Sequence, residues 1–187
     1  ASHAGTTPLP SRQDALLGAS HLVQAVQTAA TMHAPHGRGT VGQLTVKPNS
    51  RNVVPERVDC TIDIRHPDPD ALQDMAQHIQ QMLSQICTEL KLSSRLEEIW
   101  YAPPTDFHPA CIDALRRAAD CLNLAHMDII SGAGHDAKYL AQICPTAMVF
   151  IPCKDGISHN EIEAADKTHV AAGCHVLLQA ILEQAEG

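Results

Sequence analysis

Apolar residues recur every three or four positions between residues 69 and 90, and this stripe is the clearest pattern in the chain. Its members are Leu72, Met75, Ile79, Met82, Leu83, Ile86 and Leu90. Asp68 can cap a helix and Pro69 is favoured in a first helical turn, so the two residues mark its start. The spacing predicts one long helix that packs its apolar face on a sheet.

A second helix is predicted to end before Pro35, with Ser11 or Asp14 as its N-cap. Its apolar positions are Leu16, Ala19, Leu22, Val23, Val26 and Ala30. Between the two helices, four apolar residues alternate with four polar ones. They are Val58, Cys60, Ile62 and Ile64, and Asp59, Thr61, Asp63 and Arg65. This alternation predicts a half-buried strand with a polar open face.

Two further strands, predicted at 40–47 and 96–101, give the order helix, strand, strand, helix, strand in the first hundred residues. One more strand before the first helix would complete a ferredoxin-like split βαβ sandwich, and the segment around His3 is its predicted remnant. A sheet that lacks a strand leaves an edge exposed. This edge favours a homodimer formed through residues 1–101.

Paired prolines at 103–104 predict a domain boundary, with residues 1–101 before it and 102–187 after it. The second part predicts helices from Pro109, at 135–141 and from a cap at Thr168, with short strands at 127–130 and 146–151. The expected core faces of its longer helices are Ile112, Leu115, Ala119 and Leu122, and Val170, Cys174, Leu178 and Ile181. This alternation predicts an α/β fold with a thin sheet.

Composition narrows the class of partner. The formal net charge is -8, with only 13 lysines and arginines, which argues against nucleic acid and anionic membranes. No apolar stretch approaches the length of a membrane span. The seven cysteines are scattered without a C-x-x-C pair, which is typical of reduced thiols in a cytoplasmic protein. A small molecule or another protein is therefore the favoured partner.

The loop at 156–163 combines the imidazole of His159 with the carboxylates of Glu161 and Glu163. It follows an apolar run that reads as a buried strand, and α/β proteins place their sites at such positions. Two interpretations stay open. The loop is either part of an active site, or a surface loop in which Asn160 makes a turn and both glutamates are solvated.

Arg65 stands on the polar face of the predicted strand, where its guanidinium could bind a substrate carboxylate through two nitrogens, with Asn52 beside it. The alternative for Arg65 is an ion pair with Asp59 or Asp63. His3 lies in a segment where a histidine usually has no role.

Gly132 and Gly134 lie between a predicted strand and a helix. Backbone N–H groups there could bind an anion, and a simple tight turn explains the glycines equally well. His135 and Asp136 favour the functional interpretation modestly.

Four motifs follow one another in the chain, at 2–8, at 52–55 together with 65–66, at 132–137 and at 156–160. In this order and at this separation they resemble the C-terminal half of the hydantoinase/carbamoylase family of metal-dependent amidohydrolases. The match covers essentially the whole chain. Members of the family include N-carbamoyl-L-amino acid hydrolases, allantoate amidohydrolases and β-ureidopropionases.

The resemblance implies a lid domain that mediates dimerisation and the C-terminal part of a zinc-peptidase-like α/β catalytic domain with two divalent metal ions, zinc or manganese. It implies hydrolysis of a C–N bond in a ureido or amide substrate that carries a carboxylate, with release of ammonia and CO2. Asn52 and Arg65 would bind the carboxylate, catalytic His3 would reach the partner's active site, and His159 would bind metal. The residues implied to line the substrate pocket are Gly132, Ala133, Gly134 and His135.

The family's other metal ligands and its general-base glutamate belong to an N-terminal half that these 187 residues do not contain. Zinc needs about four ligands, or three and a water, so His159 cannot hold it alone. We therefore expect the chain by itself to be inactive. Two alternatives stay open: a non-catalytic ferredoxin-like dimerisation or binding module, and a peptidase or aminoacylase relative.

Overall fold

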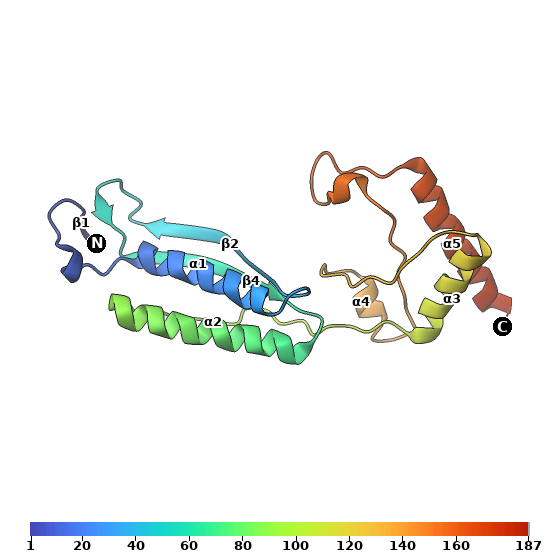
Figure 1. Ribbon diagram of the computed structural model, residues 1–187, viewed down its shortest axis with the longest axis horizontal. Coiled ribbons are helices and arrows are strands. Elements are labelled where there is room, and N and C mark those ends of the chain that lie inside the picture. The colour runs from blue at the N-terminus through green and yellow to red at the C-terminus, as the bar shows by residue number, and fades with distance from the viewer. Residues whose placement is uncertain (187) are drawn as a thin grey trace. The chain divides into compact units, whose positions relative to one another are not determined.

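The computed structural model describes residues 1–186, and the chain divides between Pro104 and Thr105 into two compact units (Figure 1). The first unit contains β1 (Ser2–His3), η1 (Leu9–Ser11), α1 (Ala15–Met32), β2 (Arg38–Lys47), β3 (Val53–Val54), β4 (Arg57–Arg65) and α2 (Pro69–Leu90). The second contains α3 (Pro109–Cys121), α4 (Ala137–Leu140), η2 (Lys154–Gly156) and α5 (Lys167–Glu186). Within residues 1–186, none of these helices combines the length and apolarity that a transmembrane span requires.

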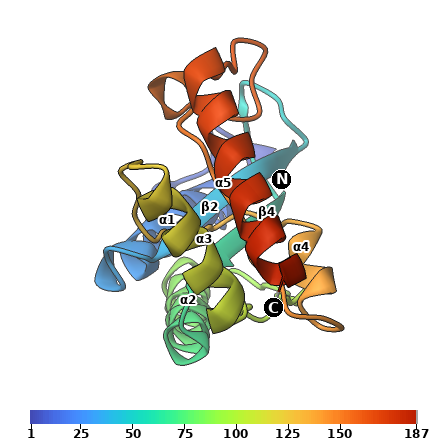
Figure 2. The ribbon, with the colours of Figure 1, turned by 90° about the vertical axis from the view of Figure 1, so that its right-hand side faces the viewer.

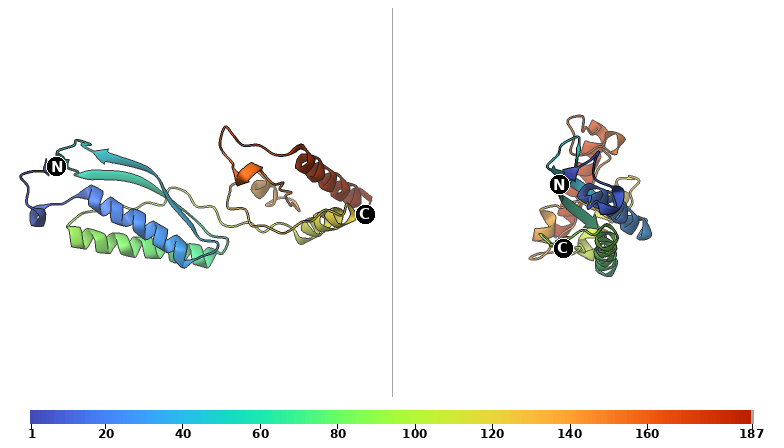
Figure 3. Two further views of the ribbon diagram at one scale, coloured as in Figure 1. Left: turned by 45° about the horizontal axis from the view of Figure 1, so that its top comes forward. Right: turned by 90° about the vertical axis from the view of Figure 1, so that its left-hand side faces the viewer.

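In the first unit, α1 and α2 lie side by side against one face of the antiparallel pair β2–β4 (Figure 3). The buried residues of this layer are Leu22, Val26, Ala29, Ala30, Met75, Ile79 and Ile86, and the strand residues Val41, Cys60, Ile62 and Ile64 pack on them. A side chain at Gly39 would come within 2.8 Å of the Val26 carbonyl oxygen, so glycine lets β2 approach α1 closely. The predicted stripe of α2 and the alternation of β4 are confirmed.

Both predicted helix starts in this unit are confirmed, because Asp14 and Asp68 are the N-caps of α1 and α2. The Asp14 carboxylate accepts hydrogen bonds from the N–H groups of Leu16 and Leu17 at 3.0 and 3.1 Å, whereas Ser11 lies in η1. The Asp68 carboxylate accepts the N–H of Asp70 at 2.9 Å. These carboxylates satisfy N–H groups that have no partner within the helix.

The prediction of a strand at 96–101 is wrong, because this segment has no regular structure and Ile99 is 84% exposed. In a split βαβ sheet, the last strand pairs with the strand that precedes the first helix. Among the described residues that position holds only β1, and β1 pairs with β3 instead of joining β2–β4. Without a neighbour to satisfy its backbone groups, the last segment does not form a strand.

In the second unit, α3 packs on α5 through small side chains (Figure 2). The buried residues are Ala114, Ala118, Ala119, Val176 and Ala180. The predicted core face of α5 is therefore wrong: Leu178 and Ile181 are 54% and 55% exposed, and Val170 and Cys174 are exposed as well. Alanines allow the two helix backbones to approach closely, and this selects the face with the smaller residues.

Of the short elements predicted in the second unit, one is confirmed and the rest are wrong. The short helix is confirmed as α4, but residues 127–130 and 146–151 form no strands, because no neighbouring strand among the described residues pairs with them. The Thr146 carbonyl accepts the N–H of His108 at 2.9 Å, which is a bond to a loop residue and not to a strand. Thr168 lies inside α5, and the carboxylate of Asp166 accepts its N–H at 2.7 Å, so Asp166 takes the predicted capping role.

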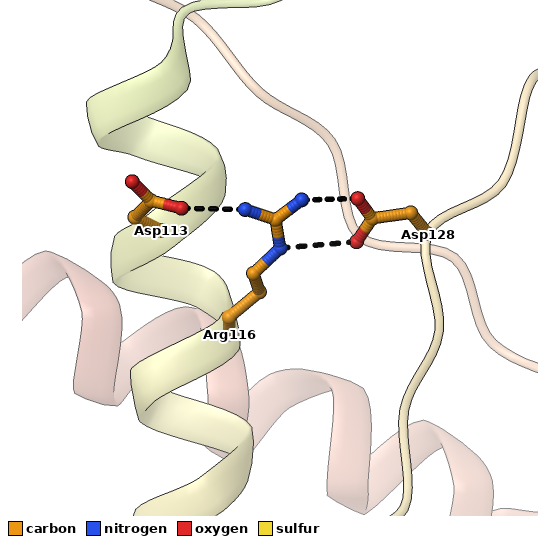
Figure 4. A network of polar contacts seen from close by, with 3 residues as sticks. All are labelled: Asp113, Arg116 and Asp128. Atoms are coloured by element: carbon orange, nitrogen blue, oxygen red, sulfur yellow. Dashed lines mark hydrogen bonds and ion pairs between the residues drawn. The ribbon is translucent and has the colours of Figure 1, made fainter.

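Arg116 ties α3 to the segment that follows it (Figure 4). Its Nη1 donates to Asp113 at 2.5 Å, and its Nε donates to Asp128 at 3.1 Å, with a second bond from Nη2 to the same carboxylate. These bonds from Arg116 lower the pKa of Asp128 below its ordinary value. On the next position, Arg117 donates from Nε to Glu183 of α5 at 3.0 Å.

The buried core of the first unit gives a stability prediction. Met75 is 0% exposed, so Met75→Ala should lower the free energy of unfolding by about 2–5 kcal/mol through lost burial and a cavity. Met32, which is 64% exposed, provides the matched control, and Met32→Ala should change the free energy of unfolding by less than about 0.5 kcal/mol. Urea unfolding followed by circular dichroism measures both. Equal effects of the two substitutions would contradict the assigned core.

The Arg116 network gives a pH prediction. Because the pKa of Asp128 is lowered in the folded chain, its contribution to stability is present above the unfolded pKa of about 3.9 and is lost as the pH falls through the lower folded value. Arg116→Gln should move the Asp128 pKa back up in an NMR titration of the carboxyl carbon. Arg117→Gln, which removes the neighbouring guanidinium, should leave it in place, and a shift of equal size in both variants would contradict the assignment.

Candidate active site

The structure brings His3 and Asn52 together through the β1–β3 pair. His3 faces Val53 in the register, and the N–H of Ala4 donates to the Asn52 carbonyl at 2.8 Å. Nδ1 of His3 accepts the N–H of Gly5 at 3.0 Å, so the proton of a neutral imidazole lies on Nε2, which becomes a hydrogen-bond donor.

Among the described residues, the side-chain amide of Asn52 forms a hydrogen bond through its oxygen but not through its NH2 group. Its Oδ1 accepts the hydroxyl of Ser50 at 3.0 Å. Its NH2 group donates to no residue in the part of the chain that the structure describes. Asn52 is exposed, so this NH2 group is oriented by Ser50 and can donate to an anion from solution.

Arg65 ends β4 on the open face of the sheet, and its guanidinium forms a fork with Asp63. The Nε–Oδ1 distance is 2.9 Å and the Nη2–Oδ2 distance is 2.6 Å. The bonds from Arg65 lower the pKa of Asp63. The ion pair is thus present as one sequence interpretation expected. Both side chains are about half exposed, and such a pair contributes at most about 1 kcal/mol, so an incoming carboxylate can compete with Asp63.

The structure does not bring Arg65 to His3 and Asn52 within one chain. Asn52 directly precedes β3, five residues before β4 begins at Arg57, and Arg65 is the last residue of β4. The eight residue steps from Arg57 to Arg65 span about 26 Å of extended backbone. Arg57, at the near end, forms the same kind of fork with Asp59, at 3.0, 2.9 and 2.7 Å.

In the second unit, Ser131 organises the loop that contains the two glycines. The hydroxyl of Ser131 lies 2.8 Å from Nε2 of His135 and accepts the N–H of Ala133 at 3.2 Å. The His135 ring also packs edge-on against Phe150, with centroids 5.5 Å apart. Side chains at Gly132 and Gly134 would meet open space, so crowding does not require glycine there. Ser131 directly precedes the motif at 132–137, and its contact with His135 depends on a loop geometry that the motif does not encode.

His159 lies in a turn with a left-handed backbone, at φ 56°. Its N–H donates to the Glu163 carboxylate at 2.9 Å, and Oδ1 of Asn160 accepts the N–H of Ile162 at 3.1 Å. Asn160 therefore makes the turn that one interpretation expected. Glu163 holds the backbone of His159 and not its ring, and the exposed imidazole remains on the surface of the loop.

The described residues do not form a metal centre by themselves. Within residues 1–186, no group of three or more histidine, cysteine, aspartate or glutamate side chains is arranged to hold a metal ion. His159 would supply one ligand, and a zinc or manganese ion needs several more. The donor set of this chain alone therefore does not fit the metal pair that the resemblance implies.

Comparison with known proteins identifies the class. The sequence profile of peptidase family M20/M25/M40 matches residues 11–183, and the chain belongs to that family. Within it, the relatives that the chain matches are N-carbamoyl-L-amino-acid and allantoate amidohydrolases and hydantoinase/carbamoylase family amidases, as the four motifs predicted. It is 40% identical over 185 residues to an N-carbamoyl-L-amino-acid amidohydrolase of Rhizobium meliloti, covering 99% of this chain and 44% of the relative.

Two further relatives are similar to the chain over nearly its whole length. An allantoate amidohydrolase of Escherichia coli (strain K12) is 34% identical over 177 residues, covering 94% of this chain and 43% of the relative. The crystal structure of a hydantoinase/carbamoylase family amidase from Burkholderia multivorans superposes with a TM-score of 0.94 at 51% identity, covering 98% of this chain and 45% of that one. The α/β fold class is confirmed. The chain spans about half the length of the relatives it matches, and the roles of the site residues stay predictions.

Proposed function

We propose that the complete protein hydrolyses the ureido group of a substrate that also carries a carboxylate, either an N-carbamoyl-L-amino acid or allantoate. The names of the relatives support this substrate class. The observation that carries the proposal is the exposed guanidinium of Arg65, held in a fork at the end of a strand whose other face is in the core. A fork of this geometry matches a carboxylate.

The substrate carboxylate would displace Asp63 from the guanidinium of Arg65 and form the same two hydrogen bonds. Two charge-assisted hydrogen bonds would fix the position of the carboxylate and the distance of the ureido carbon from it. Because the strand backbone is paired with β2, Arg65 can orient the substrate without rearranging the fold.

His3 would act at the reacting end. His3, with its proton on Nε2, can donate to the oxygen that gains negative charge when the ureido carbonyl is attacked. The NH2 group of Asn52 would bind the substrate carboxylate together with Arg65, as the resemblance implies. Water adds to the carbonyl carbon and the bond to the amino-acid nitrogen breaks. The products are the amino acid and carbamic acid, and carbamic acid decomposes to ammonia and CO2.

A homodimer accounts for the separation of these groups. The distance of about 26 Å along β4 prevents Arg65 and the His3–Asn52 pair of one chain from meeting on one small substrate. In a two-fold dimer, the His3–Asn52 pair of one subunit can meet Arg65 of the other. We propose that residues 1–101 form the lid that makes this contact.

The metal requirement belongs to the complete protein. The catalytic role of divalent metals in M20 amidohydrolases is general, and His159 would be one ligand of such a site. Since the described residues do not fit a metal pair, the remaining ligands must come from outside this chain, and we expect residues 1–187 alone to release no ammonia. Gly132, Ala133, Gly134 and His135 would line the substrate pocket.

Arg65→Lys tests the proposal in the complete protein. Lysine keeps the charge but loses the fork, so KM for an N-carbamoyl-L-amino acid should rise about tenfold while kcat changes little. Arg57→Lys is the matched control, because Arg57 makes the same fork with Asp59 on the same strand and should leave KM unchanged. The assay follows ammonia release. An unchanged KM in Arg65→Lys would remove Arg65 from the site, and no release by the unsubstituted protein would contradict the function.

A further inference from the structure

Arg38 lies directly opposite Arg65 across the β2–β4 pair. Opposed residues of an antiparallel pair project from the same face, with Cβ atoms about 5 Å apart, and like charges at such positions destabilise the sheet. Both arginines are exposed. The open face of the sheet therefore ends in two opposed arginines, and an anion bound there would offset their like charges.

Three histidines surround this end of the sheet, and with Arg38 and Arg65 they form what we call the arginine corner. The ring of His66 lies 5.9 Å from that of His33 and 6.2 Å from that of His36. The corner is thus rich in cationic and protonatable groups, in a chain whose formal net charge is -8.

Neighbouring carboxylates are already engaged. Asp63 is bound to Arg65, and the carboxylate of Asp68 caps α2 through the N–H of Asp70. Arg38 donates from Nη1 to the carbonyl oxygens of Pro35 and Gly37 at 2.7 and 2.9 Å. These bonds anchor the guanidinium of Arg38 by one nitrogen, and no residue among 1–186 accepts from its Nε or Nη2, so that edge can meet a ligand.

The other end of the same sheet provides the contrast. Lys47 lies opposite Arg57, so this end of the sheet also has a pair of like charges. There, however, Asp59 accepts three hydrogen bonds from Arg57 and also attracts Lys47, whereas the Glu56 carboxylate is bound to the N-terminal ammonium group at 2.8 Å. One carboxylate thus serves both cations at that end, whereas at the arginine corner Asp63 bonds Arg65 and the described hydrogen bonds of Arg38 go to backbone carbonyl oxygens.

We propose that Arg38 and Arg65 form a subsite for two carboxylates, with Arg38 selecting substrates that carry a second acidic group. This rests on the proposed function, in which Arg65 binds the first carboxylate. The substrate class is then the N-carbamoyl derivative of a dicarboxylic amino acid. Arg38 acts as a specificity-determining residue, and a substrate without the second carboxylate leaves it facing water.

The test compares N-carbamoyl-L-aspartate with its neutral isostere N-carbamoyl-L-asparagine, using the complete protein. KM should be about tenfold lower for the aspartate derivative, since an ion pair replaces a neutral contact. Arg38→Gln should remove this preference, and Lys47→Gln, the matched change at the other end of the sheet, should retain it. A preference that survives Arg38→Gln, or a KM raised equally for both substrates, would overturn the proposal.

A binding measurement separates this proposal from the proposed function. Succinate should perturb the NMR signals of the Arg38 and Arg65 Nε–H groups at about tenfold lower concentration than acetate. Absence of hydrolysis together with this preference would remove the proposed activity and keep the subsite. Equal concentrations for the two acids would overturn the subsite whether or not the protein is a hydrolase.

Discussion

The nine extended residues of β4 are the constraint on which the candidate site depends. One face of the strand supplies Cys60, Ile62 and Ile64 to the core formed with α1 and α2, which fixes the strand in place. The same alternation forces the polar residues onto the open face and sets Arg65 at one end. A rigid strand of this length keeps Arg65 away from His3 and Asn52, and the proposed dimer follows from that separation.

The sequence was informative where burial is decided locally. The stripe of α2 and the alternation of β4 each record which side of an element faces the core, and Asp14 and Asp68 mark the helix starts through bonds to adjacent N–H groups. The α5 face could not be predicted in this way. Its apolar residues occur on more than one side, and the small residues that suit α3 decide which side is buried.

Non-local pairing explains the remaining misses. Residues 96–101, 127–130 and 146–151 have strand-like composition, but a strand forms only beside a neighbour that satisfies its backbone groups. The site shows the same limit. The motifs identified Arg65, Asn52 and His159 as candidates, whereas the opposition of Arg38 to Arg65 depends on a register that includes a bulge between Val41 and Gln43. The hydrogen bond from the N–H of His159 to the Glu163 carboxylate likewise depends on the geometry of the turn.

The central claim is that one complete site takes Arg65 from one subunit and His3 from the other, and co-expression of two inactive variants tests it most directly. Arg65→Ala and His3→Ala should each inactivate both sites of their own dimer. In a mixed dimer one of the two sites retains both residues, so random pairing should restore about one quarter of the unsubstituted activity in an ammonia-release assay. Activity no greater than the sum of the separate variants would contradict the shared site.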